Sequence, residues 1–438
     1  MDFGQPYPSQ RAPVLGRNVV TTSQPLAAQA GLSMLARGGN AVDAAIATAM
    51  ALTVVEPTGN GLGSDAFAIV WDGAHLHGLN ASGRAPGKWT ADRFAGRTEM
   101  PQRGWDSVTV PGAVSGWMAL HQRFGSLPLE VIAAPAIRYA RDGFAVSPII
   151  ARLWAQGVGV LVDQPGFAEA FAPNGRAPRA GETFKLPALA DSLETIVASR
   201  GEAFYRGALA RQIAADAARH GAALSEADLD AHRADWVETI SAPFCGASIH
   251  ELPPNGQGII TLATLGILDS LGIGPDAADT LETTHLAIEA TKLALADSAA
   301  FVGDPTDMAI SAAEMIDPHY LQERAKLVDR QRAGDPGHGN PKRGGTVYLA
   351  TADAEGRMVS FIQSNYMGFG SGVVVPGTGI SLQNRGGGFS LRAGHPNTVG
   401  PGKRPFHTII PGFALDGDGN ALTAFGVMGG PMQAQGHT

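Results

Sequence analysis

The stretch GGTVYLATA (344–352) decides the fold of this chain, together with the turn DAEG (353–356) and the returning run RMVSFIQS (357–364). Both runs are rich in β-branched and aromatic residues and flank a polar turn with glycine, which predicts a β-hairpin. Thr346 stands at the threshold of the first strand. A cut between Gly345 and Thr346 would place the threonine hydroxyl beside its own free α-amine, so that one residue carries nucleophile and base. The alternative is an ordinary loop that ends in a β-branched residue.

Upstream, the sequence predicts a strand, two helices and a second strand. The run 19–22 favours a strand, and the helix that follows has Pro25 in its first turn, Ser23 as a candidate cap and a stop at Gly38-Gly39. Asn40 is placed to cap a helix over 41–55.

A glycine loop at 57–63 then leads into a strand at 66–71. A dinucleotide-binding fingerprint requires strand, loop and helix in that order, so the order found here excludes it.

The middle of the chain, 128–301, predicts mainly helices, among them a long amphipathic one over 281–301. Residues 329–343 are polar and rich in Gly, Pro, Arg and Lys, which is typical of a linker. After Thr346 the chain predicts mostly strands, at 372–376, 379–384, 409–415 and 422–428.

Composition restricts the classes of function. With 438 residues, 44% hydrophobic and 16% charged, the chain is expected to be compact and to form two lobes or one large layered domain. A net charge of −8 without a basic cluster argues against nucleic acid or an anionic membrane as partner. No apolar run approaches the ~20 residues of a membrane span and the N-terminus lacks secretory features, so we expect a cytoplasmic protein. The single Cys245 excludes an internal disulfide and is expected to be buried.

Several polar or glycine-rich positions are candidates for chemistry. Arg84 lies in SGRAP (82–86) and Arg385 precedes three glycines, where a ligand and the backbone approach closely. Gly429-Gly430 follows a predicted strand and would offer backbone N–H groups to an oxyanion, although such pairs are more often turns. CxxC, HExxH and GxSxG patterns are absent from the sequence, which favours chemistry without a metal; we expect no cofactor.

Short motifs spread over nearly the whole chain resemble the γ-glutamyltransferase family of N-terminal-nucleophile hydrolases. They are GGNAVDAA (38–45), VEP with its glycine loop (55–63), GRAP (83–86), VPG (110–112), GDP (303–305), GSG (370–372), PGTG (376–379) and PGKRP (401–405).

The resemblance implies an α+β fold, a four-layer αββα sandwich with a mainly helical middle region. It also implies a precursor that cuts itself before Thr346. The large segment, 1–345, and the small segment, 346–438, would then stay together as a heterodimer.

The resemblance also implies roles for individual residues. Thr346 matches the family's nucleophile and Ser364 the hydroxyl that supports it. Arg84 matches the arginine that holds the substrate carboxylate. Gly429 and Gly430 match the pair of the oxyanion hole.

The chain departs from the family pattern where the glutamyl α-amine is bound. Arg385 stands in place of the family's glutamine or glutamate, and Gly388 in place of an aspartate. An ammonium would lose its counter-ion and face an added cation, whereas two arginines around a small pocket favour a carboxylate. Within the family the chain looks closest to the oxamate amidohydrolase branch, and we expect it to hydrolyse a small carboxylate-bearing amide.

The resemblance also implies further substrate-binding positions. His407 and Thr408 replace the family's paired serines. Tyr366 falls where the family has a substrate-binding asparagine, and Asn365 takes that place only with a one-residue shift.

Two alternatives stay open at this stage. The first is a γ-glutamyl hydrolase or transferase that acts on glutathione-like donors. The second is an unprocessed, non-catalytic relative that serves as a binding or structural protein. The chain ends soon after Gly430, whereas family members continue, so we expect a shortened small segment, and a homo-oligomer that completes the outer layer is left open.

Overall fold

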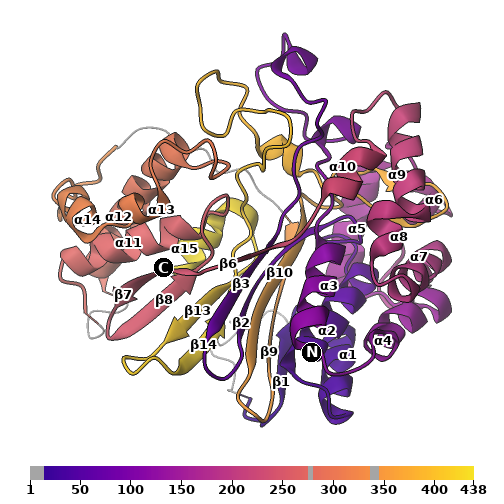
Figure 1. Ribbon diagram of the computed structural model, residues 1–438, viewed down its shortest axis with the longest axis horizontal. Coiled ribbons are helices and arrows are strands. Elements are labelled where there is room, and N and C mark those ends of the chain that lie inside the picture. The colour runs from indigo at the N-terminus through magenta and orange to yellow at the C-terminus, as the bar shows by residue number, and fades with distance from the viewer. Residues whose placement is uncertain (1–13, 275–279, 336–344) are drawn as a thin grey trace.

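The computed structural model describes residues 14–274, 280–335 and 345–438, and it contains two antiparallel sheets packed face to face (Figure 1). The six-stranded sheet has the order β1 (Val19–Thr22), β9 (Gly345–Ala352), β10 (Met358–Tyr366), β2 (Asp65–Trp71), β3 (Leu76–Ala81) and β6 (Asp235–Val237). The four-stranded sheet has the order β14 (Ala421–Phe425), β13 (Gly412–Leu415), β8 (Ala247–Glu251) and β7 (Ile240–Phe244). Phe67, Ile362 and Phe413 belong to the apolar layer that joins the sheets.

Helices cover the outer face of the six-stranded sheet. They are α1 (Pro25–Ala36), α2 (Ala41–Val55) and α3 (Ala113–Phe124), and α4 (Leu129–Asp142) packs on α2. Every residue of α2 is buried, and Asn40 Oδ1 caps this helix by accepting from the N–H groups of Val42 and Asp43, as predicted. The prediction for Ser23 was wrong: Gln24 is the N-cap of α1, while Ser23 Oγ donates to Glu56 at 2.6 Å.

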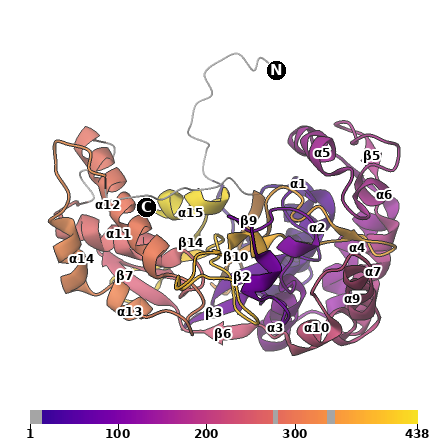
Figure 2. The ribbon, with the colours of Figure 1, turned by 90° about the horizontal axis from the view of Figure 1, so that it is seen from above.

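A second helical layer covers the four-stranded sheet. It consists of α11 (Gly258–Ser270), α12 (Leu281–Phe301), α13 (Ala312–Met315), α14 (Pro318–Ala325) and α15 (Gln433–His437). Helix α12 has the bounds that its amphipathic pattern predicts. The four layers therefore confirm the αββα sandwich, and Figure 2 shows the two helical layers on opposite sides of the strands.

A helical lobe beside α4 confirms the helical middle region. It contains α5 (Pro148–Leu161), α6 (Phe167–Phe171), α7 (Pro187–Ala198), α8 (Glu202–Arg206), α9 (Ala208–Arg219) and α10 (Glu226–Ala231), with the short pair β4 (Phe144–Ala145) and β5 (Thr183–Phe184).

The strands predicted late in the chain are shorter than expected. The predicted runs 372–376 and 379–384 contain only the two-residue strands β11 (Val374–Val375) and β12 (Ile380–Ser381), because a glycine turn joins them. The predicted linker over 329–343 lies partly outside the described residues.

Cys245 corrects another expectation. It is exposed, because with Gly246 it forms the two-residue turn between β7 and β8, where both residues have positive φ, 49° and 81°. None of the described helices is long and apolar enough to cross a membrane.

Candidate active site

Thr346 and Ser364 face each other on neighbouring central strands. Thr346 Oγ1 donates to Ser364 Oγ at 3.2 Å, and both side chains are buried. The ladder pairs Val347 with Gln363 and Gly345 with Tyr366, with an irregularity between these pairs. Gly345 thus lies in the sheet next to the predicted cleavage point, while Gly344 lies outside the described residues.

Thr346 opens onto a cavity of about 530 Å³, here named the threonine cavity. Glu56 and Arg103 contribute polar groups to it, and Leu153 and Val160 of α5 contribute an apolar wall. Burial raises the pKa of Glu56 to about 6, against the hydrogen bond from Ser23. Glu56 and Arg103 were not singled out by sequence; the position of Glu56 in the VEP motif was the available signal.

Gly59 brings Glu56 close to the cleavage point. A Cβ on Gly59 would lie 3.4 Å from Glu56 Oε1 and 3.5 Å from the carbonyl oxygen of Thr346. It would also lie 3.2 Å from Val347, which is tighter than most real contacts. A larger residue at position 59 would therefore crowd the start of β9.

Arg385 is a buried cation with open donors. Its side chain is 1% exposed, and Nη1 donates to Thr408 Oγ1 at 2.8 Å. The guanidinium carbon lies 4.8 Å from the centre of the Tyr366 ring. Nε and Nη2 have no hydrogen-bond partner within the described part of the chain. Burial lowers the pKa of Arg385 to about 10, against the charge of Asp65, so it remains a cation at neutral pH.

The two side chains named as contacts of the Arg385 guanidinium, Tyr366 and Thr408, line a second cavity of about 320 Å³, here named the tyrosine cavity. Tyr366 and Thr408 face it together with Gly388, which brings no carboxylate. Tyr366 has a φ of +77°, a strained conformation for a residue with a side chain.

Asp65 and His407 form a second buried polar group beside Arg385. Asp65 Oδ2 lies 3.1 Å from His407 Nε2, and Asp65 Oδ1 accepts from the N–H groups of Gly83 and Gly112. Burial raises the pKa of Asp65 to about 7, although the charge of Arg385 opposes the shift. Burial and the charges of Arg385 and Arg404 hold the pKa of His407 well below its ordinary value. Asp65, which pairs with Ser364 between β2 and β10, was missed by sequence reasoning.

Gln257 ties Gly430 to Thr408, since its Nε2 donates to both carbonyl oxygens, at 3.0 and 2.5 Å. Gly429 and Gly430 have φ values of +148° and +65°, which favour glycine. Asn365 is buried elsewhere: its Oδ1 accepts from Ser64 Oγ at 2.8 Å. Contacts therefore run from Thr346 through Ser364, Tyr366, Arg385, Thr408 and Gln257 to Gly430.

Arg84 lies apart from this series of contacts. Its side chain is 46% exposed, and Nη1 is 3.5 Å from Asp304 Oδ2 and 3.2 Å from the carbonyl oxygen of Gly402. Within the described residues, Arg84 is not among those that line the threonine or the tyrosine cavity.

A four-layer sandwich with a threonine at the start of a central strand is the arrangement of the N-terminal-nucleophile hydrolases. The chain belongs to the γ-glutamyltranspeptidase family, because the family model described as gamma-glutamyltranspeptidase matches residues 27–438. It is an amide hydrolase or acyltransferase of that family.

The chain is similar to curated and to solved members. It is 39% identical to the oxamate amidohydrolase proenzyme of Klebsiella pneumoniae, over 94% of this chain and 78% of that protein. It is 37% identical to the glutathione hydrolase-like YwrD proenzyme of Bacillus subtilis, over 96% of this chain and 80% of that protein. The crystal structure of cephalosporin acylase from Bacillus halodurans matches with a TM-score of 0.94 and 49% identity, over 100% of this chain and 82% of that one.

Proposed function

We propose that this chain is a self-processing threonine amidohydrolase that hydrolyses a small amide bearing a carboxylate, such as oxamate. The observation that carries the proposal is Arg385, a buried cation whose nitrogens Nε and Nη2 have no hydrogen-bond partner among the described residues. A carboxylate is the natural partner for such a fork. The relative named oxamate amidohydrolase supports the same substrate class.

Processing would begin with attack of Thr346 Oγ1 on the carbonyl carbon of Gly345. The new C–O bond replaces the C–N bond, and water then hydrolyses the ester, which leaves segments 1–345 and 346–438. Ser364, 3.2 Å from the attacking oxygen, orients the hydroxyl. Glu56 borders the same cavity and, with a pKa of about 6, is mostly ionised at neutral pH, so it is suited to accept the hydroxyl proton.

Turnover would use the freed amine of Thr346, whose reference pKa is ~7.7–8.0. The amine takes the hydroxyl proton, the oxygen attacks the substrate amide, and the N–H groups of Gly429 and Gly430 stabilise the oxyanion. Ammonia leaves, and water releases the acid from the acyl-enzyme.

Cleavage would also open the way to Arg385. In the uncut chain Gly345 pairs with Tyr366, whose ring covers the guanidinium. Release of Gly345 removes this backbone partner from a residue that already has an unfavourable φ of +77°. Tyr366 is then free to turn, and Arg385 becomes accessible from the tyrosine cavity.

The proposal is tested by ammonia release from purified, incubated protein. Oxamate should be hydrolysed and acetamide, which lacks the carboxylate, should not. Faster turnover of a γ-glutamyl anilide than of oxamate would favour the glutathione-type alternative. A single uncut polypeptide without activity would favour the non-catalytic one.

A second candidate is an acylase that releases a larger amine. The threonine cavity, about 530 Å³ with Leu153 and Val160 in its wall, has more room and more apolar surface than ammonia needs. A solved relative is a cephalosporin acylase. Release of a bulky amine from its oxalyl amide, at a rate above that of oxamate, would select this candidate.

A further inference from the structure

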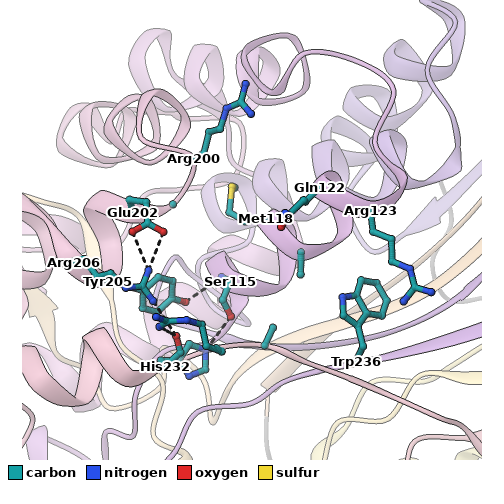
Figure 3. Close-up of a pocket in the computed structure, with 14 residues that line it drawn as sticks. Ser115, Met118, Gln122, Arg123, Arg200, Glu202, Tyr205, Arg206, His232 and Trp236 are labelled. Carbon is teal, nitrogen blue, oxygen red and sulfur yellow. Dashed lines mark hydrogen bonds and ion pairs between the residues drawn. The ribbon is translucent and has the colours of Figure 1, made fainter.

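The largest cavity described here lies outside the active site. It measures about 610 Å³ and lies between α3, the α7–α8 turn with α8, and the segment that leads into β6 (Figure 3). None of its lining residues also lines the threonine or the tyrosine cavity. We name it the arginine cavity, after the four arginines that line it: Arg123, Arg200, Arg206 and Arg233.

Three of these four arginines have no carboxylate partner among the described residues. Arg123 is bonded to a ring nitrogen of His77 and lies 4.5 Å from the Trp236 ring centre. Arg233 donates only to backbone carbonyl oxygens, and Arg200 is exposed with no ion pair in the described chain. These three arginines give the cavity a local positive excess in a chain of net charge −8.

The fourth arginine is already neutralised. Arg206 pairs with Glu202 at 2.9 Å and with Asp230 at 3.1 Å, so it lines the cavity without offering an unpaired charge to a ligand. Figure 3 shows Arg200 and Arg123 on different sides of the cavity, with Arg206 lower down beside Tyr205. Arg123 and Arg200 thus belong to separate elements, α3 and the turn before α8.

The cavity floor is neutral and fixed. His232 Nε2 lies 2.9 Å from Ser115 Oγ, and its ring stacks on Tyr205. Burial and nearby arginines lower the pKa of His232 to about 3, so it carries no charge at neutral pH. Gly201, with a φ of +86°, packs so closely on Met118 that a Cβ there would lie 2.7 Å from it. The turn that carries Arg200 is therefore held in place.

From these observations we propose that the arginine cavity binds a small molecule with two or more carboxylate or phosphate groups, at a site separate from Thr346. Its volume is in the range of small-molecule sites, ~300–1,000 Å³. Guanidinium forks on several sides match a multiply charged anion, and the neutral floor with Met118 accommodates the body of the ligand.

Isothermal titration of the whole protein with pyrophosphate and with tricarballylate tests the proposal, with acetate as the singly charged control. We expect at least one of the first two to bind more tightly than acetate by about tenfold or more, and added salt to weaken it. The better of the two identifies the ligand as phosphate-bearing or as a polycarboxylate. No preference over acetate would overturn the proposal.

Matched charge deletions locate the site. Arg200→Gln and Arg233→Gln should each weaken binding by about tenfold, and the double variant should abolish it. Arg37→Gln removes one exposed charge at the end of α1 and should bind like the wild type. Arg200 and Arg233 are exposed, so their variants should fold, which thermal unfolding checks. Wild-type binding by the folded double variant would refute the site.

Discussion

The two ends of the active site differ in how they are built. Thr346 and Ser364 are neutral hydroxyls whose positions follow from the pairing of β9 and β10. Arg385 and Asp65 are ionisable groups buried at 1% and 0% exposure, far from the solvent that would stabilise their charges. The position of the proposed nucleophile therefore depends on backbone register, whereas the proposed recognition of a carboxylate depends on buried charges. Substitutions at the Thr346 end should impair processing and catalysis, whereas substitutions at the Arg385 end should impair binding of the substrate carboxylate.

The largest effect is expected at the neutral end. Thr346→Ala removes the attacking oxygen, so the chain should stay uncut and lose all measurable activity, as intact-mass analysis and ammonia release will show. Thr351→Ala is the matched control on the same strand, since its hydroxyl donates to the carbonyl oxygen of Ala41. It should be processed normally. Two fragments from Thr346→Ala would end the proposal.

At the charged end we expect a selective loss. Arg385→Met should lower kcat/KM for oxamate by about 10–100-fold, because charge-assisted hydrogen bonds to the carboxylate disappear. Processing should persist. Asp65 loses a nearby cation in this variant and should stay protonated to higher pH, and thermal unfolding checks that the variant folds. Arg385→Lys keeps the positive charge without the forked donor geometry, so its kcat/KM for oxamate should lie between those of the wild type and Arg385→Met. Equal losses on oxamate and on an uncharged amide would contradict a role in carboxylate binding.

The two ends also differ in how well sequence predicted them. The hairpin, the capped helix α2 and the position of Thr346 at the start of a central strand follow from local patterns. Asp65 and Glu56 were missed because their unusual pKa values come from burial by segments distant in sequence. The contact of Arg385 with Tyr366 is likewise tertiary, and no spacing rule predicts it.

Glu56 is an ionisable group on the Thr346 side of the site, and the effect of its substitution on processing should be intermediate. The rate of fragment formation in the wild type should rise as pH increases through about 6, where Glu56 becomes ionised. Glu56→Gln should be about tenfold slower and should lack this rise. Thr58→Val changes another side chain of the same cavity and should keep the wild-type pH profile. An unchanged profile in Glu56→Gln would exclude Glu56 as the base.

The pH dependence of stability should report Asp65. Its pKa is raised from 3.8 to about 7, so between these pH values the unfolded chain releases a proton that the folded chain retains. The Asp65 contribution to stability therefore falls as pH rises from about 4 to 7, and then stays level. His407, with its lowered pKa, acts in the opposite direction below its ordinary value of 6.5.

The difference in melting temperature between wild type and Asp65→Asn separates the contribution of the Asp65 carboxylate from that of His407. The melting temperature of the wild type should fall relative to that of the variant as pH rises from 4 to 7, by a few degrees at most. A difference that does not change with pH would show that Asp65 ionises normally in the folded chain.

The smallest effect should come from substitution of Arg84, which lies apart from the contacts around Arg385. Arg84 is half-exposed and already bonded to Asp304 and Gly402, whereas Arg385 is buried with open donors. Exposed ion pairs contribute little, so Arg84→Gln should lower kcat/KM for oxamate by less than about fivefold. Arg97→Gln, another exposed arginine, serves as the control. If Arg84→Gln instead lowers kcat/KM for oxamate as much as Arg385→Met does, the segment that carries Arg84 must close over the substrate after cleavage. Recognition of the substrate would then require both guanidinium groups.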